Sequence, residues 1–244
     1  MTTRRTLLAS LFTFPLTAAD FWQAKKPSEW SDKEFNKIIT DSPWSRASIV
    51  TMSGGGGNRG GGEGGSRGGG AGETGRGGGG GGGGGRKGGG GGEGGGGGGN
   101  MPSISMQIRW QSSRPVKLAL AHLKFGAEAA TKPEIMEMVN REEKDYLIMI
   151  EGFPPAMARQ SQERLISNLK KNCAIHCQGK DDLLPTDVQT GQNAKGPVAI
   201  VVFPKKDPFS LDDKEVEFSM KMGNTTVKRK FKLKDMVFDG KLAM

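Results

Sequence analysis

Residues 103–110, SISMQIRW, and residues 47–52, ASIVTM, lie on either side of a long glycine tract. From Ile104 to Trp110 every second residue is apolar, which is the period of a strand with one buried face. The segment before the tract is short and rich in β-branched residues, so it also indicates a strand. We predict that these two strands pair in one sheet. The tract is then a hairpin loop inside a single domain, and lengthening such a loop from about 4 to about 48 residues costs only about 2 kcal/mol.

The tract itself, residues 53–100, is almost entirely glycine, and we predict that it is a disordered loop. A tether between two domains is the alternative, but residues 20–52 are too few to bury a core of their own. Arg59, Arg67 and Arg76 each begin an Arg-Gly-Gly triplet, so the tract resembles the RGG boxes of RNA-binding proteins. The lack of aromatic residues in the tract and its interspersed glutamates argue against RNA binding.

The chain begins MTTRRTLLASLFTFPLTAAD, in which Arg4 and Arg5 precede an apolar stretch from Leu7 to Leu16 and then small residues. This order is typical of a signal peptide, so we expect residues 1–19 to be removed on export to the periplasm or the medium. The arginine pair leaves the route open between ordinary Sec export and twin-arginine export. The apolar stretch is shorter than the roughly 20 residues that cross a bilayer, and no later segment reaches that length, so we expect no membrane span.

The formal net charge of +9 is spread along the chain and does not gather in one segment. A nucleic-acid-binding protein concentrates its excess positive charge on one face. We therefore do not expect a nucleic acid as the partner of this protein.

A short helix before the first strand has a complete start signal. Ser31 and Glu34 have capping-box spacing, and Trp30 and Phe35 occupy the two positions of a hydrophobic staple. Apolar residues at helical spacing, with prolines near the start, predict further helices later in the chain. These helices are expected at residues 115–125, 133–139 and 156–171.

Two continuous apolar runs, YLIMI at residues 146–150 and VAIVVF at residues 198–203, indicate strands in the interior of a sheet. Residues 215–234 alternate with period two around a Gly-Asn pair, which predicts a terminal hairpin. The fold class is therefore α+β, a single domain with a mainly antiparallel or mixed sheet of about five to seven strands and three or four short helices. The folded domain comprises residues 20–52 and 101–244, interrupted by the glycine-rich loop of residues 53–100.

The second strand of the terminal hairpin carries a lysine at every second position from Lys228 to Lys234. With the Gly-Asn pair as the loop, Glu217 faces Lys230, and a shift of one residue moves it opposite Lys232. Either register neutralises most of the lysine row through cross-strand ion pairs. A phosphate-binding face is the alternative, and the register favours a structural sheet face.

Cys173, His176 and Cys177 form the one cluster in the sequence with metal-ligand chemistry. On a helix the three side chains share a face and could hold a metal with a fourth ligand. On a strand the two cysteines point to one side and His176 to the other. The alternation of Cys173, Ile175 and Cys177 fits a strand that faces the core, so we expect neither a metal nor a disulfide at this cluster.

Trp22, Trp30 and Trp44 are three of the four tryptophans in the chain, and all three precede the glycine tract. Exposed tryptophans could stack on the sugar rings of a polysaccharide ligand. Tryptophans in such a segment also pack a short helix onto a sheet, and we favour this second interpretation.

The segments SEWSDKEFNKIITDSPW, IRWQSSRPVKLAL and KEVEFSMKMGNTTVKRKFKLKDMV, together with the glycine tract, resemble a group of exported bacterial proteins of unknown function. Members of this group have the pattern WSxxE followed by SPW near the amino terminus and an FKLKDMV hairpin near the carboxyl terminus. The resemblance implies export and a one-domain α+β fold, but no activity, cofactor or site residue. The segment Cys173–Cys177 is not part of it.

No catalytic constellation is visible in the sequence, because neither His122 nor His176 has a serine, cysteine or aspartate partner at a recognisable spacing. We therefore expect an exported, non-enzymatic protein without a cofactor, which binds a protein or polysaccharide of the cell envelope or has a structural role there. An exported carbohydrate-binding or carbohydrate-active protein is one alternative. An RGG-type RNA-binding protein is another, if residues 1–19 are not a signal peptide.

Overall fold

The computed structural model describes residues 20–51 and 103–244, which belong to one compact unit. The predicted signal peptide, residues 1–19, and the predicted loop, residues 53–100, lie outside the described residues. None of the helices in the described part of the chain is long and apolar enough to cross a membrane.

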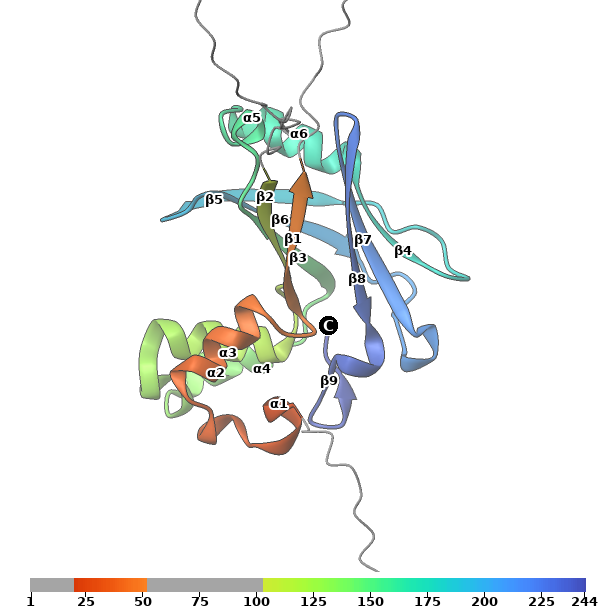
Figure 1. The fold of residues 1–244 in the computed structure, drawn as a ribbon. Helices are drawn as coiled ribbons and strands as arrows, with labels where there is room; N and C mark the ends of the chain where they lie inside the picture. The colour runs from red at the N-terminus through yellow and green to blue at the C-terminus, as the bar shows by residue number, and fades with distance from the viewer. Residues whose placement is uncertain (1–19, 52–102) are drawn as a thin grey trace, which may run out of the picture. The chain divides into compact units, whose positions relative to one another are not determined.

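The main sheet is antiparallel and has five strands in the order β1-β2-β3-β6-β5 (Figure 1). The strands are β1 (Ser45–Thr51), β2 (Ser103–Trp110), β3 (Asp145–Glu151), β5 (Asp187–Asn193) and β6 (Gly196–Pro204). Strands β1 and β2 pair along their length, from Ser45 opposite Arg109 to Thr51 opposite Ser103. This register confirms the predicted pairing of the two strands that flank the glycine tract. The interior positions of β3 and β6 in the sheet confirm what their continuous apolar runs predicted.

A second antiparallel sheet has three strands in the order β4-β7-β8. These are β4 (Cys173–Cys177), β7 (Glu215–Met222) and β8 (Thr225–Lys232), and a small ladder of β9 (Val237–Phe238) and β10 (Lys241–Leu242) follows them. Glu217 lies opposite Lys230, and Gly223 and Asn224 form the loop, so the first of the two predicted registers is correct. Gly223 has a φ of 58°, a left-handed conformation that glycine adopts without strain.

The hydrophobic core lies where the two sheets pack against each other. Trp110 of β2 contacts Phe231 of β8 edge-to-face, with ring centroids 5.3 Å apart. Phe203 of β6 contacts Phe218 of β7 in the same manner at 6.3 Å. All four rings are buried, so the apolar face of each sheet covers that of the other.

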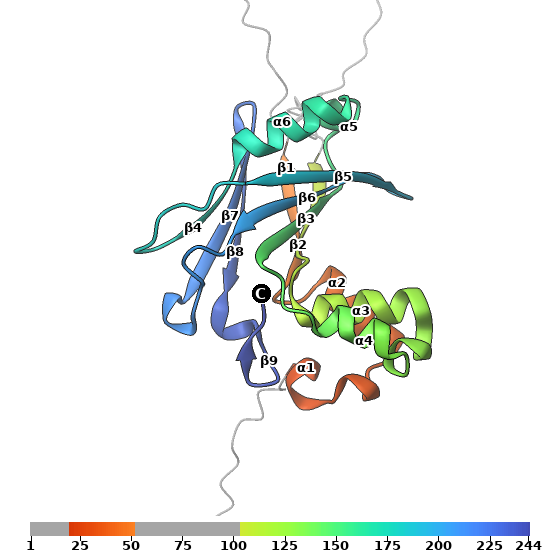
Figure 2. The same ribbon diagram turned by 180° about the vertical axis from the view of Figure 1, so that it is seen from behind.

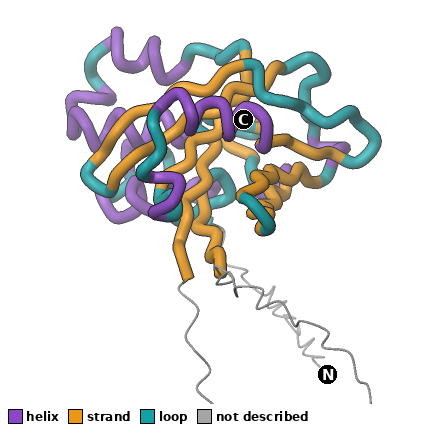
Figure 3. The backbone as a smooth tube through the Cα atoms, turned by 90° about the horizontal axis from the view of Figure 1, so that it is seen from above, coloured by secondary structure: helices purple, strands orange, loops and turns teal. Residues whose placement is uncertain are grey.

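The helices gather at two ends of the main sheet, with α2, α3 and α4 at one end and α5 and α6 at the other (Figures 1 and 2). Figure 3 shows the same helices in purple around the strands in orange. The helices are α1 (Phe21–Ala24), α2 (Asp32–Thr40), α3 (Arg114–Phe125), α4 (Pro133–Asn140), α5 (Pro155–Ala158) and α6 (Gln162–Asn172). Short 3-10 turns span Pro27–Glu29, Gly126–Ala130, Leu211–Asp213 and Leu233–Asp235.

The start of α2 has both predicted features. The Ser31 amide donates to Glu34 Oε2 at 2.8 Å, and the Glu34 amide donates to Ser31 Oγ at 3.4 Å, which completes the capping box. Trp30 and Phe35 form the staple, with ring centroids 5.3 Å apart. The observed architecture confirms the α+β fold class.

Two details of the predicted secondary structure are wrong. The helix expected at residues 156–171 is two helices, α5 and α6, because Ser161 caps a new helix by accepting a hydrogen bond from the Arg164 amide. Strand β5, DVQTGQN, was not predicted because it is a polar edge strand with little apolar alternation. Its pairing with the apolar strand β6 places it in the sheet.

Candidate functional site

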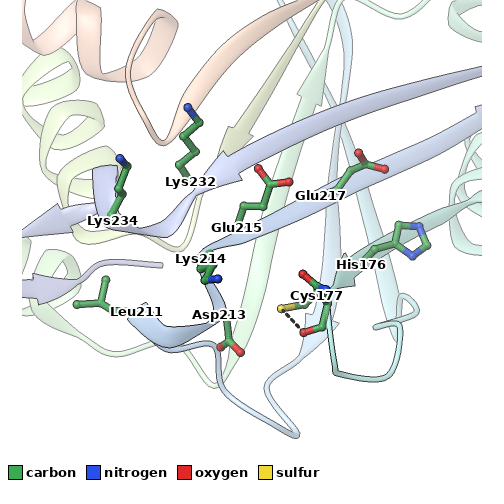
Figure 4. Close-up of a pocket in the computed structure, with 10 residues that line it drawn as sticks. His176, Cys177, Leu211, Asp213, Lys214, Glu215, Glu217, Lys232 and Lys234 are labelled. Atoms are coloured by element: carbon green, nitrogen blue, oxygen red, sulfur yellow. Dashed lines mark hydrogen bonds between the residues drawn. The ribbon is translucent and has the colours of Figure 1, made fainter.

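A hollow with a volume of about 830 Å³ lies on the outer side of the three-stranded sheet (Figure 4). Its walls come from the end of β4, the turn Leu211–Asp213, the start of β7 and the end of β8. Lys214, Lys232 and Lys234 line it, and we call it the lysine pocket. Three carboxylates, Asp213, Glu215 and Glu217, also contribute to its walls.

Each of these carboxylates already has a lysine partner. Glu215 Oε1 lies 2.6 Å from Lys230 Nζ, and Glu217 Oε1 lies 2.8 Å from Lys228 Nζ. Asp213 Oδ2 lies 3.2 Å from Lys180 Nζ. The hydrogen bond that Lys230 donates to Glu215 raises the pKa of Lys230, which stays protonated at neutral pH.

The ion pairs of the hairpin are diagonal, so the two glutamates neutralise Lys228 and Lys230 in place of the directly facing Lys230 and Lys232. In the observed register Glu215 faces Lys232 but bonds to Lys230, two residues away on the partner strand. A long side chain can reach this diagonal neighbour. The diagonal pairing leaves Lys232 without a carboxylate partner among the described residues, and Lys234, which lies beyond the ladder, has none there either.

Lys214 completes this group, because it too forms no ion pair with any residue that the structure describes. Its φ is 61° and its ψ is −62°, a backbone conformation that is rare for residues other than glycine. The Leu233 amide donates to the Lys214 carbonyl at 2.8 Å, so the chain beyond β8 holds Lys214 in this conformation. Backbone strain of this kind is concentrated at functional sites.

His176 lies at the edge of the lysine pocket and joins two other side chains. Its Nδ1 is 2.7 Å from Asp182 Oδ1, and its Nε2 is 2.8 Å from Ser219 Oγ. This is the hydrogen-bond order of a nucleophilic triad. The sequence did not reveal it, because Ser219 is far from the other two residues along the chain.

The position of Ser219 disfavours nucleophilic catalysis. The residue is only 8 % exposed, and in the middle of β7 it pairs with Ala174 on one side and Lys228 on the other. The peptide groups around it therefore belong to the two ladders and do not form an oxyanion hole. We assign the chain of hydrogen bonds a structural role, in which it connects the loop of Asp182 to the sheet.

The alternation predicted for the cysteine cluster is confirmed. Cys173 and Cys177 are buried, His176 points to the opposite side of β4, and the two cysteines are unbridged. Because of this parity, the three side chains do not converge on one point. Among the described residues, no group of three or more histidine, cysteine, aspartate and glutamate side chains has the arrangement of a metal site.

Burial raises the pKa of the Cys173 thiol to about 12. At pH 8 we expect iodoacetamide to alkylate this thiol about 10³-fold more slowly in the folded protein than in the unfolded chain, because so little thiolate is present. Mass spectrometry of the Cys177→Ser variant measures the rate at Cys173 alone, and the same variant in denaturant is the control. Equally fast labelling of the folded and unfolded chains would contradict the burial of Cys173.

The three candidate stacking residues, Trp22, Trp30 and Trp44, are all buried. Trp22 contacts Trp44 edge-to-face at 5.8 Å, and Trp30 packs between Phe35 and Phe238. Stacking on a sugar requires an exposed ring face, and neighbouring rings cover these faces instead. The tryptophans therefore pack the amino-terminal helices onto the domain, as the favoured interpretation predicted.

Comparison of the chain with protein-family models, with curated proteins and with solved structures finds no match. The candidate site therefore rests on its own geometry. Its distinctive feature is the group of three lysines around the lysine pocket.

Proposed function

We propose that this protein is a non-catalytic binding protein that works outside the cytoplasm, and that its ligand carries a negatively charged group. The observation that carries the proposal is that Lys214, Lys232 and Lys234 all line one hollow of about 830 Å³. None of the three has a carboxylate partner among the described residues.

An anionic ligand would supply the negative counter-charge that these three lysines lack. Neighbouring lysines repel one another, and the carboxylates in the same walls are occupied by Lys180, Lys228 and Lys230. The volume lies within the range of small-molecule binding sites, which is about 300–1,000 Å³. Leu211, which is 50 % exposed, adds an apolar contact at the wall, so the ligand that fits has an apolar part beside its charged group.

For an exported protein, an acidic polysaccharide of the cell envelope has this chemistry, because uronic acids combine a carboxylate with the apolar face of a sugar ring. The lysine pocket would recognise the acid group, and the buried tryptophans would take no part. The position of Ser219 supports a binding role over a hydrolytic one.

Retention on an immobilised uronic-acid polymer tests this proposal. We expect the wild-type protein to bind alginate but not neutral dextran, and the triple variant Lys214→Gln, Lys232→Gln and Lys234→Gln to bind alginate at least about tenfold more weakly. A second triple variant, Lys170→Gln, Lys171→Gln and Lys221→Gln, removes the same charge from exposed positions elsewhere and should bind as the wild type does. Equal weakening of both variants would contradict a specific site.

Cell fractionation with amino-terminal sequencing tests the export. We expect a mature protein that begins near Asp20 and lies outside the cytoplasm. An intact Met1 on a cytoplasmic protein would contradict the signal peptide.

A further inference from the structure

A second hollow, of about 400 Å³, lies along β8 between this strand and the start of β1. Strands β1 and β8 are edge strands of the two sheets, and they contact each other there (Figure 1). Basic side chains dominate the walls, and Glu215 and Asp235 are the acidic ones. The basic residues are Arg46, Lys228, Arg229, Lys230 and Lys232. We call this hollow the arginine pocket, after Arg46 and Arg229.

The registers place both arginines on the sides of their strands that face the core. Arg229 lies opposite Phe218 in the β7–β8 ladder, and Arg46 lies opposite Ile108 in the β1–β2 ladder. Phe218 and Ile108 are both fully buried. Both side chains therefore leave their strands on the core side, at the open margin between the sheets, where Arg46 is exposed and Arg229 is half-buried.

Arg229 is half-buried, and its Nε is a buried donor without a hydrogen-bond acceptor among the described residues. Its pKa is lowered first by burial and then by the positive charge of Arg46, while Asp41 acts in the opposite direction. Asp41 forms no ion pair with either arginine within the described part of the chain. A buried donor without an acceptor is costly, and so is a pair of like charges.

We propose that Arg46 and Arg229 bind a tetrahedral oxyanion, the phosphate or sulfate group of a ligand, in the arginine pocket. A guanidinium presents parallel N–H donors, including Nε–H, that match the oxygens of such a group. An oxyanion between the two arginines would accept a hydrogen bond from the unpartnered Arg229 Nε and offset the repulsion between the two charges. The site goes beyond the proposed function, because it uses different residues from the lysine pocket except for Glu215 and Lys232, which border both.

Calorimetric titration of the full-length protein with inorganic phosphate, sulfate and acetate, at constant ionic strength in chloride, tests this site. We expect phosphate and sulfate to bind the wild type and acetate to bind more weakly. Arg46→Gln and Arg229→Gln should each raise the dissociation constant for phosphate at least about tenfold. Lys221→Gln, at an exposed position at the far end of the same hairpin, should leave it unchanged.

The variants also separate this proposal from the lysine pocket. The double variant Lys214→Gln and Lys234→Gln should retain phosphate binding, because neither residue lines the arginine pocket. Tighter binding of a sugar phosphate than of inorganic phosphate would show that the group belongs to a larger ligand. Equal binding would assign the site to the free anion. Wild-type protein that binds phosphate no better than chloride, or arginine variants that bind as the wild type does, would overturn the proposal.

Thermal unfolding of Arg229→Met provides a second readout, which does not depend on the identity of the ligand. In chloride alone we expect this variant to melt at the same temperature as the wild type or higher, because it removes an unpaired charge and keeps the apolar stem. In saturating phosphate the wild type should melt higher than the variant, because only the wild type binds the anion. If Arg229→Met melts lower by the same amount in both buffers, Arg229 has a structural role and the proposal fails.

Discussion

A chain that begins at Ser103 is expected to aggregate and not to fold. Removing residues 20–51 deletes β1, which pairs with β2 along its length, and so exposes the backbone edge of β2. It also removes α2, which packs on α3, and with it the buried side chains of Phe35, Ile38 and Trp44. The remaining sheet would present apolar surface to water, and sedimentation after expression measures the loss of soluble protein.

The control for this truncation keeps β1 and changes only the segment between β1 and β2. Replacing residues 52–102 with an Asn-Gly turn should leave the fold intact and raise the free energy of unfolding by about 1–2 kcal/mol, because the closed loop is shorter. Chemical denaturation of this variant and of the full-length protein measures the difference. If residues 103–244 alone were soluble and as stable as the full chain, the pairing of β1 with β2 would not be needed for the fold.

Trp44→Ala is expected to lower the free energy of unfolding by about 3–5 kcal/mol. Trp44 is fully buried, and its ring packs edge-to-face on Trp22 and Phe238, with centroids at 5.8 Å and 6.4 Å. Its Nε1 donates to the Ala243 carbonyl at 2.7 Å, so it connects the first helices to the last residues of the chain. Domains of this kind are stable by about 5–15 kcal/mol, so the substitution would remove a large part of the total.

Trp44→Phe is the matched control for this substitution. It keeps an aromatic ring in the same space but removes the hydrogen bond to Ala243, so a smaller loss is expected, about 1–2 kcal/mol. Denaturant titrations of both variants with circular dichroism give the two values. A loss below about 1 kcal/mol in Trp44→Ala would contradict the burial of the ring between the two ends of the chain.

The sequence alone determined the features that depend on neighbouring residues. The capping box of Ser31 and Glu34 involves residues three apart, and the alternation in β2 and in the terminal hairpin repeats every second residue. The continuous apolar runs of β3 and β6 predicted interior strands, because a strand covered on both faces has no polar side. Such local patterns were sufficient for the α+β class, for the β1–β2 pairing and for the strand parity of Cys173 and Cys177.

Only the tertiary structure decided which charged groups meet. The diagonal pair of Glu215 and Lys230 depends on side-chain reach across a ladder, and register alone does not determine it. His176 meets Ser219, and Arg229 and Arg46 line one hollow, because separate strands bring together residues that are distant in sequence. The period of a strand determines the side on which a charged side chain lies but not the partner that it reaches, so the partners depend on side-chain reach and on how the two sheets pack. For this reason the fold was largely readable from the sequence, whereas the lysine pocket and the arginine pocket were not.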